Sequence, residues 1–143
     1  MTKKLNKKGT SLVELIAVIV IMGIIAGIAI PTTIAVINRQ KKNAATKSCQ
    51  NAYAAAKNVL LEASTGTLAV VEDAEDGVTF ASDTYSVTTA GLVGLEELEE
   101  NFVTAGSITF TLTGTNTFGV TVGTGTKVNG FTITYANGEF KAS

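Results

Sequence analysis

Residues 12–30, with the sequence LVELIAVIVIMGIIAGIAI, decide the fold of this chain. Glu14 is the only charged residue in this stretch, and the apolar character continues past Pro31 to Ile37. A helix of about twenty apolar residues is long enough to cross the hydrocarbon core of a bilayer. The sequence therefore predicts a hydrophobic transmembrane helix over residues 10–37.

A basic segment, MTKKLNKKG, precedes the apolar stretch, and the two together are typical of a secretory signal peptide. The apolar run, however, is longer than the ~7–15 residues of such a signal, and no small-residue cleavage site follows it. We therefore expect a permanent single-pass membrane anchor. Basic residues flank the anchor on both sides, and only the closer N-terminal cluster favours an inside N-terminus.

A second pattern begins after the anchor. Small and apolar residues recur there at spacings of three and four, which is the period of a helix with one buried face. The stripe consists of Ala45, Cys49, Ala52, Ala56, Val59 and Ala63. It predicts an amphipathic helix over residues 38–63 that continues the anchor, so that one helix runs from about Ser11 to Ala63, and Gly66 is a stop signal just beyond its end. Cys49 lies on the stripe, so we expect a buried and unreactive thiol.

The sequence predicts mainly β structure in the C-terminal half. Residues 64–91 are expected to form a loop with short strands at 78–80 and 84–87, and residues 94–103 a short acidic helix. Apolar residues alternate with threonine or other small residues in three runs, and Asn137-Gly138 is a strong hairpin signal. These runs predict an antiparallel meander over residues 107–141. The expected fold class is α+β, a long N-terminal helix packed against a small antiparallel sheet.

Composition limits the chemistry available to the chain. Its 143 residues carry a net charge of −1, with no histidine and one cysteine. Histidine-based catalysis and an internal disulfide are therefore excluded, and there is no basic footprint for nucleic acid. Residues 72–76 and 96–100 are acidic, but they show no EF-hand spacing and no base partner, so we interpret them as solvated surfaces. No metal, cofactor or enzymatic activity is expected.

Residues 7–15, K-K-G-T-S-L-V-E-L, resemble the class III signal of type IV prepilins and pseudopilins. The resemblance implies that residues 1–9 are a leader, which prepilin peptidase cuts after Gly9, leaving Thr10 as an N-methylated first residue. Glu14 would then be the fifth mature residue, which in this family pairs with the N-terminal amine of a neighbouring subunit. Pro31 matches the proline in the first helix of the family.

The resemblance also implies a function and partners. The chain would be a structural pilin that polymerises with copies of itself into a helical surface filament for adhesion, biofilm formation or motility. Its partners would be the prepilin peptidase and methyltransferase, the pilus assembly platform with its ATPase, and the inner membrane before assembly. Residues 10–37 would form the filament core, and residues 38–143 an extracellular pilin head. The lack of a cysteine pair suggests a pilin of Gram-positive type.

Two alternatives and one ambiguity remain open at this stage. The chain is also similar to pseudopilins of type II secretion or competence machines, and competence would bring nucleic acid in as a partner. A monomeric single-pass protein with a ligand-binding β domain is the second alternative. Gly23 and Gly27 form a GxxxG pattern, which allows either close helix packing or a chance match in an Ala/Gly-rich anchor.

Overall fold

The structure is a computed structural model that describes residue 9, residues 11–114 and residues 116–143. It divides into two compact units, residues 1–39 and residues 40–143, which we describe separately. One helix, α1, runs over Leu12–Ser64 and is common to both. The prediction of a single helix from about residue 11 to residue 63 is therefore confirmed.

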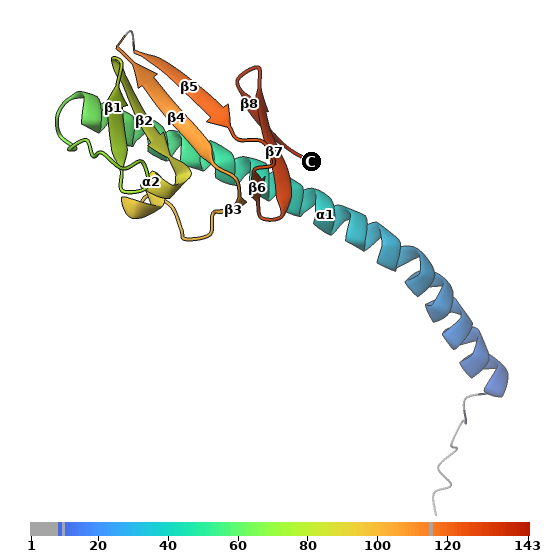
Figure 1. The fold of residues 1–143 in the computed structure, drawn as a ribbon. Coiled ribbons are helices and arrows are strands. Elements are labelled where there is room, and N and C mark those ends of the chain that lie inside the picture. The colour runs from blue at the N-terminus through green and yellow to red at the C-terminus, as the bar shows by residue number, and fades with distance from the viewer. Residues whose placement is uncertain (1–8, 10, 115) are drawn as a thin grey trace, which may run out of the picture. The chain divides into compact units, whose positions relative to one another are not determined.

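In the second unit, the helix lies along one face of two antiparallel sheets (Figure 1). The first sheet has the order β1-β2-β4-β5, formed by Val78–Ala81, Thr84–Thr88, Ile108–Thr113 and Thr117–Val122. The second has the order β3-β6-β7-β8, formed by Val103–Ala105, Lys127–Val128, Phe131–Ala136 and Glu139–Ala142. The predicted α+β class, a long helix packed against antiparallel β structure, is confirmed.

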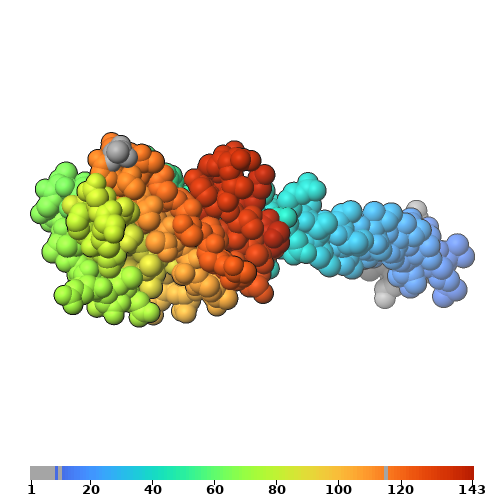
Figure 2. Space-filling view, turned by 45° about the horizontal axis from the view of Figure 1, so that its top comes forward, coloured from blue at the N-terminus to red at the C-terminus, as the bar shows by residue number. Residues whose placement is uncertain are grey.

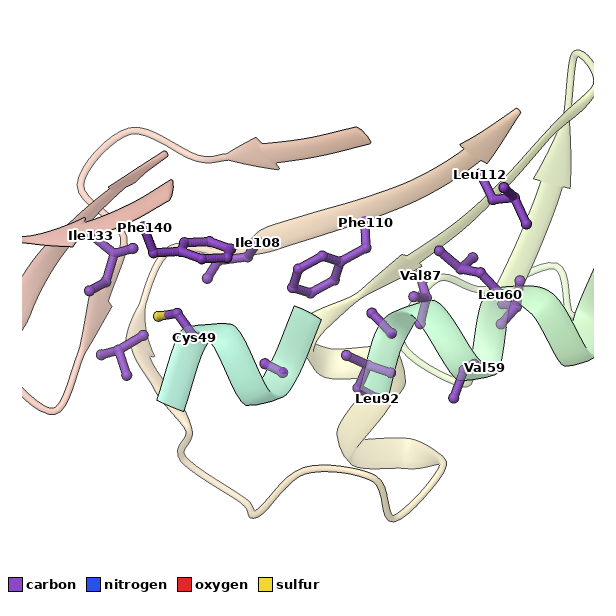
Figure 3. Packing of buried hydrophobic residues seen from close by; sticks show 14 of the residues in the cluster. Cys49, Val59, Leu60, Val87, Leu92, Ile108, Phe110, Leu112, Ile133 and Phe140 are labelled. Carbon is purple, nitrogen blue, oxygen red and sulfur yellow. The ribbon is translucent and has the colours of Figure 1, made fainter. Parts of the chain in front are cut away.

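The helix and the sheets meet through residues of complementary size. All six residues of the predicted stripe are buried, and Leu60 joins them. Four of the six are alanines, so the sheets can approach the helix closely, and the large side chains of this contact come from the sheets. Phe110 reaches from β4 toward the helix, while Ile133 and Phe140 lie near Cys49 (Figure 3). In the space-filling view the strands, orange to red, hide much of this part of the helix (Figure 2).

Local turn chemistry ends the helix and closes the last hairpin. Gly66 adopts φ +79°, and its N–H donates to the Ala63 carbonyl while the Thr67 N–H donates to the Glu62 carbonyl. These two bonds are the Schellman motif that glycine favours beyond a helix end. The hairpin expected at Asn137-Gly138 joins β7 to β8, with both residues at positive φ, as a type I′ turn requires.

The β structure differs from a single meander over residues 107–141. The short strands expected at 78–80 and 84–87 are present within β1 and β2, but they form one sheet with β4 and β5. β2 pairs with β4 over five residues, which places Val87 opposite Phe110. This pairing buries Val87 and Phe110 on the same face, against the helix. The rest of the predicted meander belongs to the second sheet.

The short helix predicted over residues 94–103 is wrong. The structure places α2 one turn earlier, at Thr89–Gly94, and residues 95–102 form turns. The Thr88 hydroxyl caps the start of α2 by accepting from the Gly91 N–H at 3.0 Å. Glu96 ends it at φ 60°, with its N–H donating to the Val93 carbonyl. A helix through four glutamates at such spacings would place like charges on one face, which is destabilising.

Phe110 provides a test of this packing. Phe110 is 1% exposed, whereas Phe80 is 47% exposed on the edge strand β1. We expect Phe110→Ala to lower the free energy of unfolding by about 3–5 kcal/mol. Phe80→Ala, which removes a ring in tilted contact with Tyr85, should cost less than about 1.5 kcal/mol.

Urea unfolding of the full chain in detergent, followed by tyrosine fluorescence, measures both losses. The chain has no tryptophan, and its three tyrosines, Tyr53, Tyr85 and Tyr135, all lie in residues 40–143, so the signal reports that unit alone. Equal losses for the two variants would contradict the placement of Phe110 in the core.

Candidate functional site

The first unit is a helix whose large apolar side chains are all exposed. Between residues 12 and 37 there are sixteen such side chains, exposed by 43% to 74%. Its most apolar window has a mean hydropathy of 2.8, and no residue of that window is buried. The favourable free energy of removing these side chains from water is on the order of 20–50 kcal/mol, at about 1.5–3 kcal/mol for each side chain. By length and composition, this helix could cross a membrane.

Glu14 is the single charge on this surface, and it lies in the first turn of α1. Its Oε2 accepts a hydrogen bond of 3.2 Å from the backbone N–H of Ser11. The Ser11 carbonyl in turn accepts from the Leu15 N–H at 3.1 Å, so Ser11 is the N-cap residue. This is half of a capping box, in which the carboxylate satisfies an N–H that the helix leaves free. Glu14 therefore directs its carboxylate toward the N-terminal side.

Nothing within the described part of the chain neutralises Glu14. No lysine or arginine among the described residues forms an ion pair with it. Gly9 is exposed and lies outside any helix or strand. Thr10 and residues 1–8 lie outside the described residues, so the predicted leader and methylation site have no structural description here.

Gly23 and Gly27 face open space. A Cβ atom built at either glycine would meet no heavy atom of another part of the described chain within 4 Å. Among the described residues, nothing takes up the close approach that the GxxxG pattern allows.

Pro31 lies inside α1, which is one helix from Leu12 to Ser64. Proline removes one N–H donor from the helical ladder. The two threonines that follow donate to nearby carbonyls: Thr32 to Ala29 at 2.9 Å, and Thr33 to Ala29 at 2.8 Å. These bonds satisfy the hydroxyls in apolar surroundings, but they do not reach the Gly27 carbonyl, four residues before Pro31, which loses its helical donor.

The other candidate groups of the sequence do not assemble into a reactive site. Among the described residues, no three histidine, cysteine or acidic side chains gather as a metal site would require. The acidic run at residues 72–76 is a turn region, in which the Asp73 carboxylate accepts from the Glu75 N–H at 3.0 Å. Cys49 is fully buried, as predicted from its place on the stripe.

Sequence reasoning missed two features of the helix. Ser11 and Glu14 match the S-x-x-E signature of a capping box, which is readable in the sequence. The bonds from Thr32 and Thr33 follow from their position just after Pro31 in a helix, and this position was equally readable.

No family model, curated protein or solved structure matches this chain.

Cys49 generates a prediction about pH. Burial raises the pKa of its thiol from 9.0 to about 11. A thiol-specific reagent should therefore not react with the folded chain at pH 8, and should react fully after denaturation. Because the raised pKa favours the neutral thiol in the folded state, this contribution to stability is complete below pH 9 and is lost as the pH rises to about 11.

The matched variant is Cys49→Ala, which keeps a small apolar side chain and has no thiol to ionise. Its unfolding free energy should fall less than that of the natural chain between pH 9 and pH 11. Rapid labelling of the folded chain at pH 8 would contradict the buried position of Cys49.

Proposed function

We propose that this chain is a structural subunit of a type IV pilus. On this proposal, it is cut after Gly9, methylated at Thr10 and polymerised through its N-terminal helix into a surface filament. The observation that carries the proposal is the helix over residues 12–37, which is apolar and exposed on every side, with one carboxylate in its first turn.

Such a helix suits two environments in turn. Before assembly, lipid covers it, and the chain is a single-pass membrane protein. After assembly, the same side chains pack against helices of other copies, where Gly23 and Gly27 allow backbones to come close. Because the helix is apolar around its whole circumference, it can be surrounded by neighbours, as the core of a filament requires.

Glu14 gives this assembly a register. A cut after Gly9 creates an amine at residue 10, next to the Ser11 N–H that the carboxylate already contacts. An amine and a carboxylate from neighbouring copies neutralise one another in apolar surroundings, whereas either one alone is costly there. A copy that slides along its neighbour separates the two charges, so the pair favours one axial position.

The experiment that tests the proposal is the intact mass of the chain recovered from the cell surface and from the membrane. We expect the loss of residues Met1 to Gly9 and the added mass of one methyl group. A full-length, unmethylated chain in both fractions would contradict the proposal and favour a monomeric membrane protein. A processed chain without long purified filaments would favour a pseudopilin.

Replacement of Glu14 tests the register separately from the capping of the helix. Glu14→Gln keeps an oxygen that accepts from the Ser11 N–H but has no charge, whereas Glu14→Ala removes both. Loss of one partner of a buried ion pair costs about 3–5 kcal/mol, so both variants should reduce assembled filament by about 100-fold or more. Filament recovered by shearing, compared with the pool in the membrane, measures this.

Glu62→Gln is the matched control, because Glu62 is an exposed glutamate near the other end of the same helix. It should assemble as the natural chain does. If Glu14→Gln also assembles normally while Glu14→Ala does not, the carboxylate acts as a helix cap and the intermolecular pair is wrong.

A further inference from the structure

A groove crosses the second unit beside α2. One part has a volume of about 740 Å³ and runs between the loop at residues 74–76, α2 and the segment at residues 101–107. A second part of about 520 Å³ continues between the segment at residues 97–102 and the exposed side of α1. Asn101 and Phe102 line both parts, so the two form one surface feature.

Apolar and acidic residues line the groove, and we call the two sets its floor and its edges. The floor consists of Ala90, Val93, Phe102 and Val103 in the larger part. The edges consist of five acidic residues: Glu75 and Asp76 in the larger part, and Glu97, Glu99 and Glu100 in the smaller part. No lysine or arginine among the described residues lines either part, and none forms an ion pair with these carboxylates.

The two edges are held by the backbone around α2. The Thr88 hydroxyl donates to the Ala74 carbonyl at 2.8 Å and also caps α2, which joins the loop to the helix. Gly91 packs against the same loop so closely that a Cβ there would lie 2.6 Å from the Gly77 oxygen. On the other side, the Glu97 N–H donates to the Leu92 carbonyl at 2.9 Å. The acidic edges therefore keep a set position relative to the floor.

The chain also carries the complementary charge, on a separate surface. Arg39, Lys41, Lys42 and Lys47 are all exposed on α1, and none is in an ion pair with another described residue. They span about 12 Å of helix at 1.5 Å per residue. At about 100° per residue, Arg39, Lys42 and Lys47 lie within about 140° of the helix circumference, and Lys41 lies outside this arc. Residues 40–143 as a whole have six lysines and eleven carboxylates, and this short stretch holds four of the seven basic side chains of the processed chain.

We propose that the groove binds residues 39–47 of α1 from a second copy of the chain. The proposal rests on the filament function above and adds a contact between subunits outside the apolar core. The carboxylates meet Arg39, Lys42 and Lys47, and the methylene stems of the two lysines cover the floor around Phe102. Each copy offers one groove and one basic stretch, so the contact repeats from copy to copy without closing, as an open helical filament needs.

A charge exchange tests this contact in the full chain. Glu97→Lys with Glu100→Lys reverses one edge of the groove, and Arg39→Glu with Lys42→Glu reverses the facing side of the basic stretch. Facing like charges cost several kcal/mol, so each pair of changes should lower the assembled fraction by about tenfold or more. A chain with all four changes restores opposite charges in every contact and should recover to within about twofold of the natural chain.

The control reverses two exposed glutamates outside the groove, with Glu62→Lys and Glu139→Lys, and should assemble normally. Tyrosine fluorescence during unfolding shows whether each variant is folded. If the groove variant assembles normally, the contact is wrong. If it fails to assemble and the fourfold change does not restore it, the groove has another occupant, such as a divalent cation or a different protein, and the proposal is again overturned.

Disulfide trapping gives a second measurement that does not depend on charge. The only natural cysteine is buried, so the exposed residues Asn101 and Lys42 can be replaced by cysteine without background. Asn101→Cys with Lys42→Cys should give a ladder of covalent multimers under mild oxidation. Glu139→Cys with Lys42→Cys should not. Equal ladders, or none, would contradict the contact.

Failure of this proposal can be told apart from failure of the filament function. If the natural chain is processed and forms filaments, but the charge and trapping experiments fail, only the groove contact is wrong. If the natural chain is neither processed nor assembled, the filament function is wrong, and the groove contact, which depends on it, is wrong as well.

Discussion

The structure depends on one unmet constraint: the apolar surface of residues 12–37 must be removed from water, and no described part of the chain covers it. Burial of that surface is worth more than the net stability of a typical domain, which is about 5–15 kcal/mol. The helix therefore requires apolar surroundings that the described part of the chain does not supply. A bilayer satisfies the constraint for a single copy, and a bundle of helices satisfies it for many.

The residues of α1 change in character along its length. A charge lies in its first turn, glycines and a proline lie in its exposed apolar part, and alanines near its end contact the sheets of the second unit. The second unit packs on that last part, with large side chains from the sheets filling the space that the alanines leave. One continuous helix thus joins an exposed apolar surface to the core of the second unit.

Much of the fold could be predicted because it is local. Apolar periodicity set the bounds of α1 to within a residue, and Asn137-Gly138 identified the last hairpin. The helix expected over residues 94–103 failed because α2 ends at Gly94 and Glu96, the first of the four glutamates, has a backbone φ of 60° that a helix does not allow. The division into two sheets depends on pairing between residues about 25 apart, and the groove depends on three segments meeting in space. Neither leaves a short-range pattern in the sequence.

The central claim is that Glu14 of one copy meets the N-terminal amine of another inside an apolar bundle. A structure of the surface filament at side-chain resolution measures this directly, through the distance from the Glu14 carboxylate to the nitrogen of residue 10 in the adjacent copy. The account predicts a charge-assisted hydrogen bond of about 2.7–2.9 Å. A Glu14 carboxylate that faces solvent or only its own Ser11 N–H, with the neighbouring amine elsewhere, would contradict it.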